Sequence, residues 1–415
     1  MHLGSRSSIM LRHLRACLLA LACTTEFSTV PAQSAERPVF ELLHLWTSPI
    51  EQPALEVLKD AIVGAGLSWR EHRVKGNFYG VRRELADRMA LDVSPSAVFW
   101  IGAFDRKSRY QGDVFRRIDE GLGGDDIRGM LLPEILSEVS SEKGLNALPL
   151  AIHLQNVAIA NEKLFKRLGI PYPSSWAQFL EIAPSLKSAG VTPLAVSGQR
   201  WLFRFLYLSI LADGLEPEEF ERLLFATMPR DRFIAIAKRS FEMLRALKPF
   251  SSSNYDSIVW DDAVRQVIDG TSAMTITGDF AAPAINGEDV KCAGPPGSNF
   301  LMWSFDVVAF PVRKDRAAQD IAIPVLFSRD VLTRFGAAKG GVPVVTGVTR
   351  SLLDSCSATS LDRWKSQKKV LLSSENWGEV LNIVSSLAQL VWTSDSIDLH
   401  QVASQLFDEI SGAAK

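Results

Sequence analysis

The chain has 415 residues, which is too long for one ordinary hydrophobic core and long enough for two or three domains. Its 47% hydrophobic and 22% charged residues match the usage of globular proteins and exclude a disordered, collagen-like or coiled-coil chain. The 45 basic and 47 acidic side chains give a net charge of -2. The chain therefore has no broad basic field to hold a phosphate backbone, and we expect no nucleic-acid partner.

Residues 1–35 have the layout of a secretory signal peptide. Three arginines precede the apolar run Ala16–Cys23, and a polar stretch then ends in small residues. The run is shorter than the ~20 residues that span a bilayer, so we expect export to the periplasm without a helical anchor. We predict cleavage after Ala32, with a cut after Ala35 as the alternative. Cys23 follows a loose lipoprotein box, so its lipidation is a second, less favoured alternative.

Strand and helix patterns alternate in the first part of the mature chain. Buried strands are predicted at Phe40–Trp46, Trp69–Val74 and Ser96–Ile101, with amphipathic helices at Glu51–Ala65 and Gly80–Leu91. This alternation predicts an α/β fold with a parallel sheet covered by helices on both faces. Ligands of such sheets sit beyond the carboxyl ends of the strands, so His44–Ser48 is a candidate edge of a binding site.

A second α/β unit follows an apolar crossing segment that runs from Leu145 to His153 and continues at Val157–Asn161. Strands are expected at Ser272–Gly278 and Leu301–Phe310. Helices are expected at Ser175–Ala189, Phe203–Ala212, Pro217–Phe225, Arg232–Leu247, Trp260–Gly270, Ala317–Phe335 and from Trp377 onward. The order of these elements does not repeat that of the first unit.

The sequence lacks the motifs of the common catalytic and metal sites. No two histidines of the mature chain have metal-binding spacing, and no nucleophile elbow, phosphate loop or dinucleotide fingerprint occurs. The acids Glu51, Asp261, Asp262, Asp279 and Asp306 could supply a glycosidase pair, but no spacing selects two of them. We therefore expect no enzyme, cofactor or metal, and a glycan-cleaving enzyme is the last of the alternatives.

The chain is rich in tryptophan, with ten against five tyrosines. Trp46, Trp201, Trp303 and Trp377 sit beside loop-forming or polar residues. An indole face packs flat on the C–H face of a sugar ring and leaves the hydroxyls free for hydrogen bonds. For any single tryptophan the alternative is a core position.

Six segments occur in one order along almost the whole mature chain. They are His44–Ser48 with Glu51, Leu148–Asn161, Pro173–Phe179, Val191–Ala195 with Gly198–Trp201, Met274–Phe280 and Lys339–Pro343. Each is weak alone, but the ordered set resembles the periplasmic solute-binding proteins of carbohydrate ABC importers, the extracellular solute-binding family 1. The resemblance is closest to the glucose/mannose-binding subgroup.

The resemblance implies a type II periplasmic-binding-protein fold, with two α/β lobes, a hinge crossed more than once and a ligand cleft between the lobes. Residues 36–151 and 304–348 would form the first lobe, and residues 152–303 and 349–415 the second. The protein would be a monomer that captures a sugar, closes over it and delivers it to an ABC transporter permease. The alternative is a periplasmic sensing subunit of the same fold that reports to a membrane signalling protein.

The resemblance also assigns ligand-binding positions, namely Trp46, Glu51, Gln199, Trp201, Asp279, Trp303, Asp306, Lys339 and Trp377. Trp46 would stack on the sugar, and Lys339 would donate to hydroxyls unless it is a solvated turn lysine. Asp279 would accept hydroxyl protons or cap a helix. Asp306 would bind the sugar, cap, or pair within the hinge, where His153 is expected to be structural.

Five positions depart from the subgroup pattern: Leu45, Ile101, Leu154, Ser304 and Trp377 stand where a tryptophan, lysine, arginine, asparagine and histidine are expected. A sugar hydroxyl buried without a partner costs about 1–3 kcal/mol. The resemblance therefore does not imply glucose as the ligand. Trp303 and Trp377 would instead offer a second stacking surface for a different saccharide.

Cys292 and Cys356 are the cysteines left in the mature chain. An exported protein meets an oxidising compartment, so we predict a disulfide between them, with two separate buried thiols as the alternative. The resemblance favours the disulfide, because the subgroup is expected to carry cysteines at these positions.

Overall fold

The structure is a computed structural model that describes residues 37–75, 78–102, 114–118, 124–141, 144–285, 287, 289–313, 315–372 and 377–413. The predicted signal peptide, its cleavage sites and Cys23 lie outside these ranges. The chain from Pro38 onward forms one compact unit. In these ranges no helix has both the length and the apolar character needed to span a bilayer.

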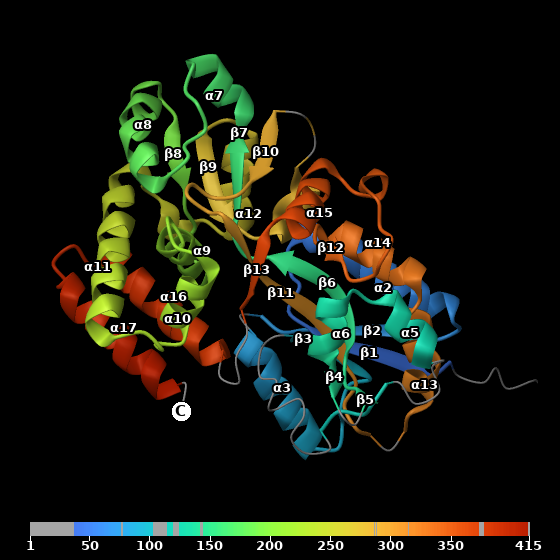
Figure 1. The fold of residues 1–415 in the computed structure, drawn as a ribbon. Helices are drawn as coiled ribbons and strands as arrows, with labels where there is room; N and C mark the ends of the chain where they lie inside the picture. Colours follow the sequence, from blue (N-terminus) through green and yellow to red (C-terminus); the bar gives the residue numbers. More distant parts are fainter. Residues whose placement is uncertain are drawn as a thin grey trace, which may run out of the picture. The chain divides into compact units, whose positions relative to one another are not determined.

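The first sheet has seven strands in the order β12–β6–β11–β3–β1–β2, with β13 paired to β11 (Figure 1). The strands are β1 (Val39–His44), β2 (Ser68–Arg73), β3 (Ala97–Ile101), β6 (Leu148–Leu154), β11 (Phe300–Ala309), β12 (Val342–Pro343) and β13 (Lys368–Leu371). β1 is parallel to β2 and β3, as the alternating pattern predicts. The prediction of a parallel sheet is wrong for β11, which is antiparallel to β3 and β6. A strand supplied about 200 residues later is outside the reach of a local βαβ pattern.

Helices α2 (Gln52–Gly64), α3 (Phe78–Ala90), α13 (Ala317–Leu326) and α14 (Arg329–Lys339) contact strands of this sheet or one another. The single helix expected at 317–335 is therefore two helices. Ser328 interrupts it by accepting a hydrogen bond from the Val331 N–H, which caps a new helix. Two short helices, α5 (Gly124–Met130) and α6 (Pro133–Val139), and the hairpin β4 (Ser140–Ser141) and β5 (Gly144–Leu145) precede β6.

The second sheet has four strands in the order β10–β7–β9–β8. These are β7 (Val157–Asn161), β8 (Thr192–Ala195), β9 (Ser272–Thr277) and β10 (Val290–Ala293). The chain around it forms α7 (Glu162–Leu168), α8 (Trp176–Ser188), α9 (Arg200–Leu211), α10 (Pro217–Leu224), α11 (Arg230–Leu247) and α12 (Trp260–Ile268). The C-terminal helices are α15 (Ser355–Ser366), α16 (Trp377–Thr393) and α17 (Leu399–Ala413), of which α16 packs on α9.

The chain passes between the two sheets at β6–β7 and again at β10–β11. β6 and β11 lie side by side over most of their length and are buried throughout. Asn156, in the turn between β6 and β7, donates to the carbonyl of Phe300 and accepts from the N–H of Met302. One buried side chain therefore fixes the start of β11 against the other crossing.

The predicted disulfide is confirmed. Cys292 of β10 is bonded to Cys356 at the start of α15, with 5.3 Å between their Cα atoms. The alternative of two separate thiols is wrong. The bond joins two segments that are 64 residues apart in the sequence.

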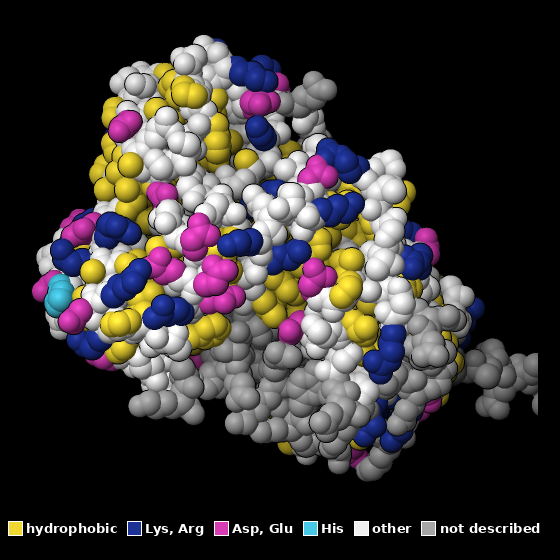
Figure 2. Space-filling view, viewed as in Figure 1, with side chains coloured by type: hydrophobic (Ala, Val, Ile, Leu, Met, Phe, Trp, Pro, Cys, Tyr) yellow, Lys and Arg dark blue, Asp and Glu magenta, His cyan; other side chains and the backbone are white. Residues whose placement is uncertain are grey.

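Acidic and basic side chains are interspersed on the face drawn in Figure 2. Lys368 of β13 pairs with Glu216 and Glu218 at the start of α10, and Lys369 pairs with Glu134 of α6. Because most of these groups are well exposed, each pair adds little stability.

Candidate functional site

A buried histidine joins three segments at the crossing. His153 of β6 has its Nδ1 atom 2.8 Å from Oδ1 of Asp279 and its Nε2 atom 3.2 Å from Oδ2 of Asp306. The other oxygen of Asp279 accepts the N–H of Leu154 at 2.9 Å. Asp279 follows β9 and Asp306 lies on β11, so the histidine connects the end of a second-sheet strand to both crossing strands.

The charge state of His153 follows from these neighbours. Burial alone would lower the pKa of the imidazole, but the carboxylates of Asp306 and Asp279 outweigh that penalty and raise it to about 9. At neutral pH the group is therefore an imidazolium between two carboxylates. This agrees with the structural role expected for His153, and it shows Asp306 paired within the hinge.

Lys339 and Glu51 form a second charged contact beside the first. Lys339 ends α14, and its Nζ atom lies 2.6 Å from Oε1 of Glu51, at the turn that precedes α2. The lysine side chain is 4% exposed and that of Glu51 is 13% exposed. The alternative of a solvated turn lysine is therefore wrong. The same Nζ atom lies 5.8 Å from the ring centre of Phe280, which follows β9.

The two glycines after Lys339 make this close approach possible. Gly340 has a φ of +79°, and a methyl group there would lie 2.5 Å from Cδ of Pro283 and 2.8 Å from the carbonyl oxygen of Asp279. A methyl group on Gly341 would overlap the carbonyl of Ile152. Residues without Cβ atoms are therefore required for the end of α14 to pack on segment 279–284 and on β6.

Trp46 lies in the core below Lys339. It is 1% exposed, and its ring centre is 4.9 Å from that of Phe99 and 5.6 Å from that of Phe335. Lys339 Nζ lies 5.6 Å from the same ring. The indole of Trp46 therefore occupies a core position, the alternative stated for any single tryptophan, and it does not offer a free face to a sugar in this structure.

Trp303 and Asp306 are not brought together. Successive side chains of a strand point to opposite faces, and Trp303 lies on the face of β11 opposite Ser304 and Asp306. Its ring packs edge-on against Trp364 at 4.9 Å. Trp377 is the first residue of α16, and its side chain lies outside the described part of the structure.

A cluster of aromatic rings lies on the second-sheet side, where Trp201, Trp260 and Phe280 are half-buried and Phe205 is buried. Trp201 of α9 is 6.0 Å from Phe280 and 5.6 Å from Phe205, and Trp260 meets Phe280 edge-on at 5.2 Å. The side-chain oxygen of Gln199 accepts a hydrogen bond from the main-chain N–H of Trp260 at 2.8 Å, so Gln199 holds the start of α12 in place. Trp260 and Phe280 were not among the predicted ligand-binding residues. Their signal was an aromatic residue directly beside an acid, Asp261 and Asp279 respectively.

These contacts connect a charged pair to three aromatic rings in one continuous series of neighbouring side chains. We call this series the aromatic strip; its members are Glu51, Lys339, Phe280, Trp201 and Phe205. Ser48 adds a second link between the same regions, because its Oγ donates to Oδ2 of Asp261 at 3.4 Å. Indole faces beside a carboxylate and an ammonium group can contact both the C–H face and the hydroxyls of a small polar ligand.

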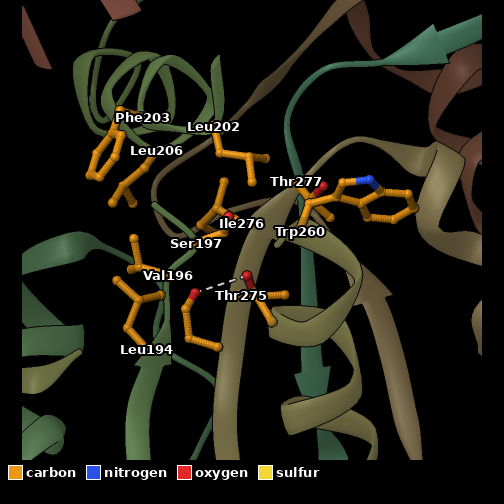
Figure 3. A pocket seen from close by; sticks show the side chains of 12 residues that line it. Leu194, Val196, Ser197, Leu202, Phe203, Leu206, Trp260, Thr275, Ile276 and Thr277 are labelled. Carbon is orange, nitrogen blue, oxygen red and sulfur yellow. Dashed lines mark hydrogen bonds between the residues drawn. The ribbon is translucent and has the colours of Figure 1, made fainter. Parts of the chain in front are cut away.

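A small cavity lies at the carboxyl ends of β8 and β9, under α9 (Figure 3). Its volume is about 20 Å³, which is room for one water molecule, and Thr275 closes one side by donating to the carbonyl of Ala195. None of the nine predicted ligand-binding residues lines it. In the described ranges, no three His, Cys, Asp or Glu side chains are grouped so as to hold a metal ion.

The chain is similar in sequence and in fold to bacterial extracellular solute-binding proteins. The family model of bacterial extracellular solute-binding proteins matches residues 92–325. A probable sugar-binding periplasmic protein of Mesorhizobium japonicum is 27% identical over 365 residues, and one of Brucella melitensis is 25% identical over 358; each alignment covers 83% of this chain and 84% of the relative. Among solved structures, a chitin oligosaccharide binding protein superposes with a TM-score of 0.75 at 17% identity, covering 91% of this chain and 99% of that one.

The chain has two sheets joined by paired crossing strands, and charged and aromatic groups from the two sheet regions meet at the crossing. This is the two-lobed type II periplasmic-binding-protein fold. The predicted fold class is thereby confirmed. The chain belongs to the bacterial extracellular solute-binding protein family.

Proposed function

We propose that this protein binds a sugar in the periplasm and delivers it to the permease of an ABC importer. Family membership supports solute capture, and the relatives named as sugar-binding periplasmic proteins support both the ligand class and the compartment. The signal-peptide layout of residues 1–35 is consistent with export. We further propose a monomer that releases its ligand unchanged.

The proposed lobes are residues 36–151 with 304–348, and residues 152–303 with 349–415. The observation that carries the proposal is the aromatic strip, which combines Glu51 and Lys339 of the first lobe with Phe280 and Trp201 of the second. A ligand held by both ends of such a strip binds best when the lobes are together. Binding would therefore shift the population toward the closed form.

In this proposal the tryptophans have different roles from those the resemblance implies. Trp201 is partly exposed on the strip and would supply the stacking surface for the sugar. Trp46 would support Lys339 from below, and Trp303 would pack the back of β11. Glu51 and Lys339 would exchange part of their mutual contact for hydroxyl groups.

The test is a thermal-shift screen over mono- and oligosaccharides, followed by calorimetric titration of each hit. A ligand that binds only the native state raises Tm by mass action.

We expect Trp201→Ala to weaken binding of the best sugar by about tenfold or more, from the lost indole contact. The matched control is Trp69→Ala, which removes an indole from β2. A screen in which no sugar raises Tm, or equal losses in the two variants, would contradict the proposal. Micromolar binding of glucose would contradict the expectation of a different saccharide.

A further inference from the structure

Arg204 of α9 is a half-buried cation near the crossing. Its guanidinium carbon lies 4.7 Å from the ring centre of Phe205, the last member of the aromatic strip. Among the described residues, its hydrogen bond is from Nη2 to Oε1 of Gln155, at a long 3.5 Å. Among the residues the structure describes, no carboxylate is within ion-pair distance of it.

The surroundings of Arg204 come from both proposed lobes. Gln155 lies in the turn between β6 and β7 and donates to the hydroxyl of Ser304 on β11 at 2.8 Å. The phenol of Tyr79, on α3, interacts electrostatically with the guanidinium. The charged end of Arg204 therefore lies where α3, α9 and the crossing strands converge, one helical turn from Trp201.

The described residues supply no anion to compensate the charge of Arg204. Burial lowers the pKa of Arg204 to about 10, so the group is still a cation at neutral pH. A largely desolvated cation without an anion is unfavourable. Two other cations near the crossing have carboxylate partners: Lys339 pairs with Glu51, and His153 with Asp279 and Asp306.

Arg363 is a buried arginine that also has no carboxylate within ion-pair distance among the described residues, but its hydrogen bonds differ from those of Arg204. It donates to the main-chain carbonyl of Asn156 and to the side chain of Gln367 at 3.2 Å each. These hydrogen bonds hold Arg363 within the fold, although its Nη2 atom has no partner among the described residues. Arg204 instead has a long contact and a half-buried side chain beside Phe205 of the strip.

We propose that Arg204 binds a negatively charged group of the ligand, and that the ligand is therefore an acidic saccharide carrying a carboxylate, of the uronic or aldonic acid class. A planar guanidinium matches a carboxylate through two parallel hydrogen bonds, and one anion would compensate the buried charge. The sugar ring would lie on Trp201, with its hydroxyls toward Glu51 and Lys339. This inference rests on the sugar-binding function proposed above.

The experiment compares matched neutral and acidic probes with the mature protein: D-glucose with D-glucuronate, D-galactose with D-galacturonate, and lactose with lactobionate. We expect the acid of at least one pair to bind about tenfold more tightly than its neutral partner. Arg204→Gln should bring the ratio of acidic to neutral affinity close to one, and Arg204→Lys should retain part of the preference. Arg200→Gln, which removes an exposed arginine from the same helix, should retain all of it.

A melting curve for each variant checks that it is folded. Should neutral sugars bind as tightly as their acids in every pair, or should a folded Arg204→Gln keep the preference, the acidic-ligand inference fails while the sugar-binding function stands. Should no member of any pair change Tm, the sugar-binding function fails and the inference fails with it.

Discussion

The Nδ1 atom of His153 lies 2.8 Å from Oδ1 of Asp279, and this contact ties strand β6 to the end of β9 in the other sheet. Asp306 holds the second ring nitrogen from β11. A movement that separates the two sheets at this point must either break a buried ion pair or carry all three groups together. We therefore infer that the lobes rotate about this cluster rather than through it.

Replacing His153 with alanine should destabilise the protein strongly. The variant leaves Asp279 and Asp306 buried without a cation, and the loss of one partner of a buried pair typically costs about 3–5 kcal/mol. Urea unfolding at pH 7 measures this free energy. His400→Ala, which removes an exposed histidine from α17, is the control and should change it by less than about 0.5 kcal/mol. A loss of under about 1 kcal/mol in His153→Ala would contradict the ion-pair assignment.

Alkaline pH should weaken the wild-type protein through the same group. The pKa of His153 is about 9 in the folded state and about 6.5 when unfolded, so the folded protein binds the extra proton between these values. Stability from this group is complete below pH 6.5 and is lost as pH rises through 9, by about 3 kcal/mol. Unfolding free energies at pH 6 and pH 9 measure the loss. The His153→Ala variant should lack this contribution; an equal alkaline loss in both proteins assigns it to other groups.

Acid should weaken the protein through a different histidine. His44 of β1 is fully buried, and its Nδ1 atom accepts the N–H of Trp46 at 3.2 Å. Burial lowers its pKa to about 4, so the folded state holds it neutral while the unfolded chain takes up a proton below pH 6.5. Stability from His44 is therefore lost as pH falls from 6.5 to 4. Between pH 7 and pH 4.5 the free energy of unfolding should fall by about 2–3 kcal/mol more in the wild type than in His44→Gln. Equal acid losses in both proteins would contradict the assignment.

The sequence was most informative where one local pattern decides the structure. The apolar strand Phe40–Trp46 and the amphipathic helices Glu51–Ala65 and Trp260–Gly270 lie within a few residues of β1, α2 and α12. Pattern failed where a distant segment decides the outcome. The antiparallel insertion of β11 depends on such distant pairing. The break at Ser328 has a local cause, a single side-chain cap that the spacing of apolar residues does not reveal.

In the candidate site, too, some residues could be predicted from the sequence and others only from the packing. The motif Lys339-Gly340-Gly341 could be picked out by resemblance, and the structure supplies its physical reason in the missing Cβ atoms. Trp46 and Trp201 could not be distinguished in sequence, because both stand beside polar residues and only packing buries the first. Arg204 could not be found at all. A lone arginine in an amphipathic helix is normally solvated, and only the position of Gln155 and Phe205 reveals its burial.

Replacing Gly340 with alanine tests the close approach at the end of α14. Gly340 and Gly347 share a φ of +79°, so alanine at either position carries the same backbone penalty of about 1 kcal/mol. A methyl group at Gly347 has open space, whereas one at Gly340 meets Pro283 and the carbonyl of Asp279. Gly340→Ala should therefore lower the free energy of unfolding by about 1–3 kcal/mol more than Gly347→Ala, and it should weaken sugar binding while the control does not. Equal losses of stability would show that segment 279–284 yields without cost.

The contribution of the Lys339–Glu51 pair to sugar binding can be tested by comparison with an exposed lysine–glutamate pair. Lys339 and Glu51 are 2.6 Å apart and largely buried, while Lys59 and Glu56 are 2.9 Å apart on the exposed face of α2. Lys339→Met keeps the aliphatic stem over Trp46 but removes the charge, so Glu51 is left partly buried without its partner. We expect the affinity for the sugar to fall by about tenfold or more, because both the donor and the alignment of the acceptor are lost. Lys59→Met should leave the affinity within about twofold, since an exposed pair outside the strip contributes little. Calorimetric titration of both variants, with melting curves to confirm folding, separates the two cases. An unchanged affinity in a folded Lys339→Met protein would show that the buried pair only holds α14 against α2 and never touches the ligand.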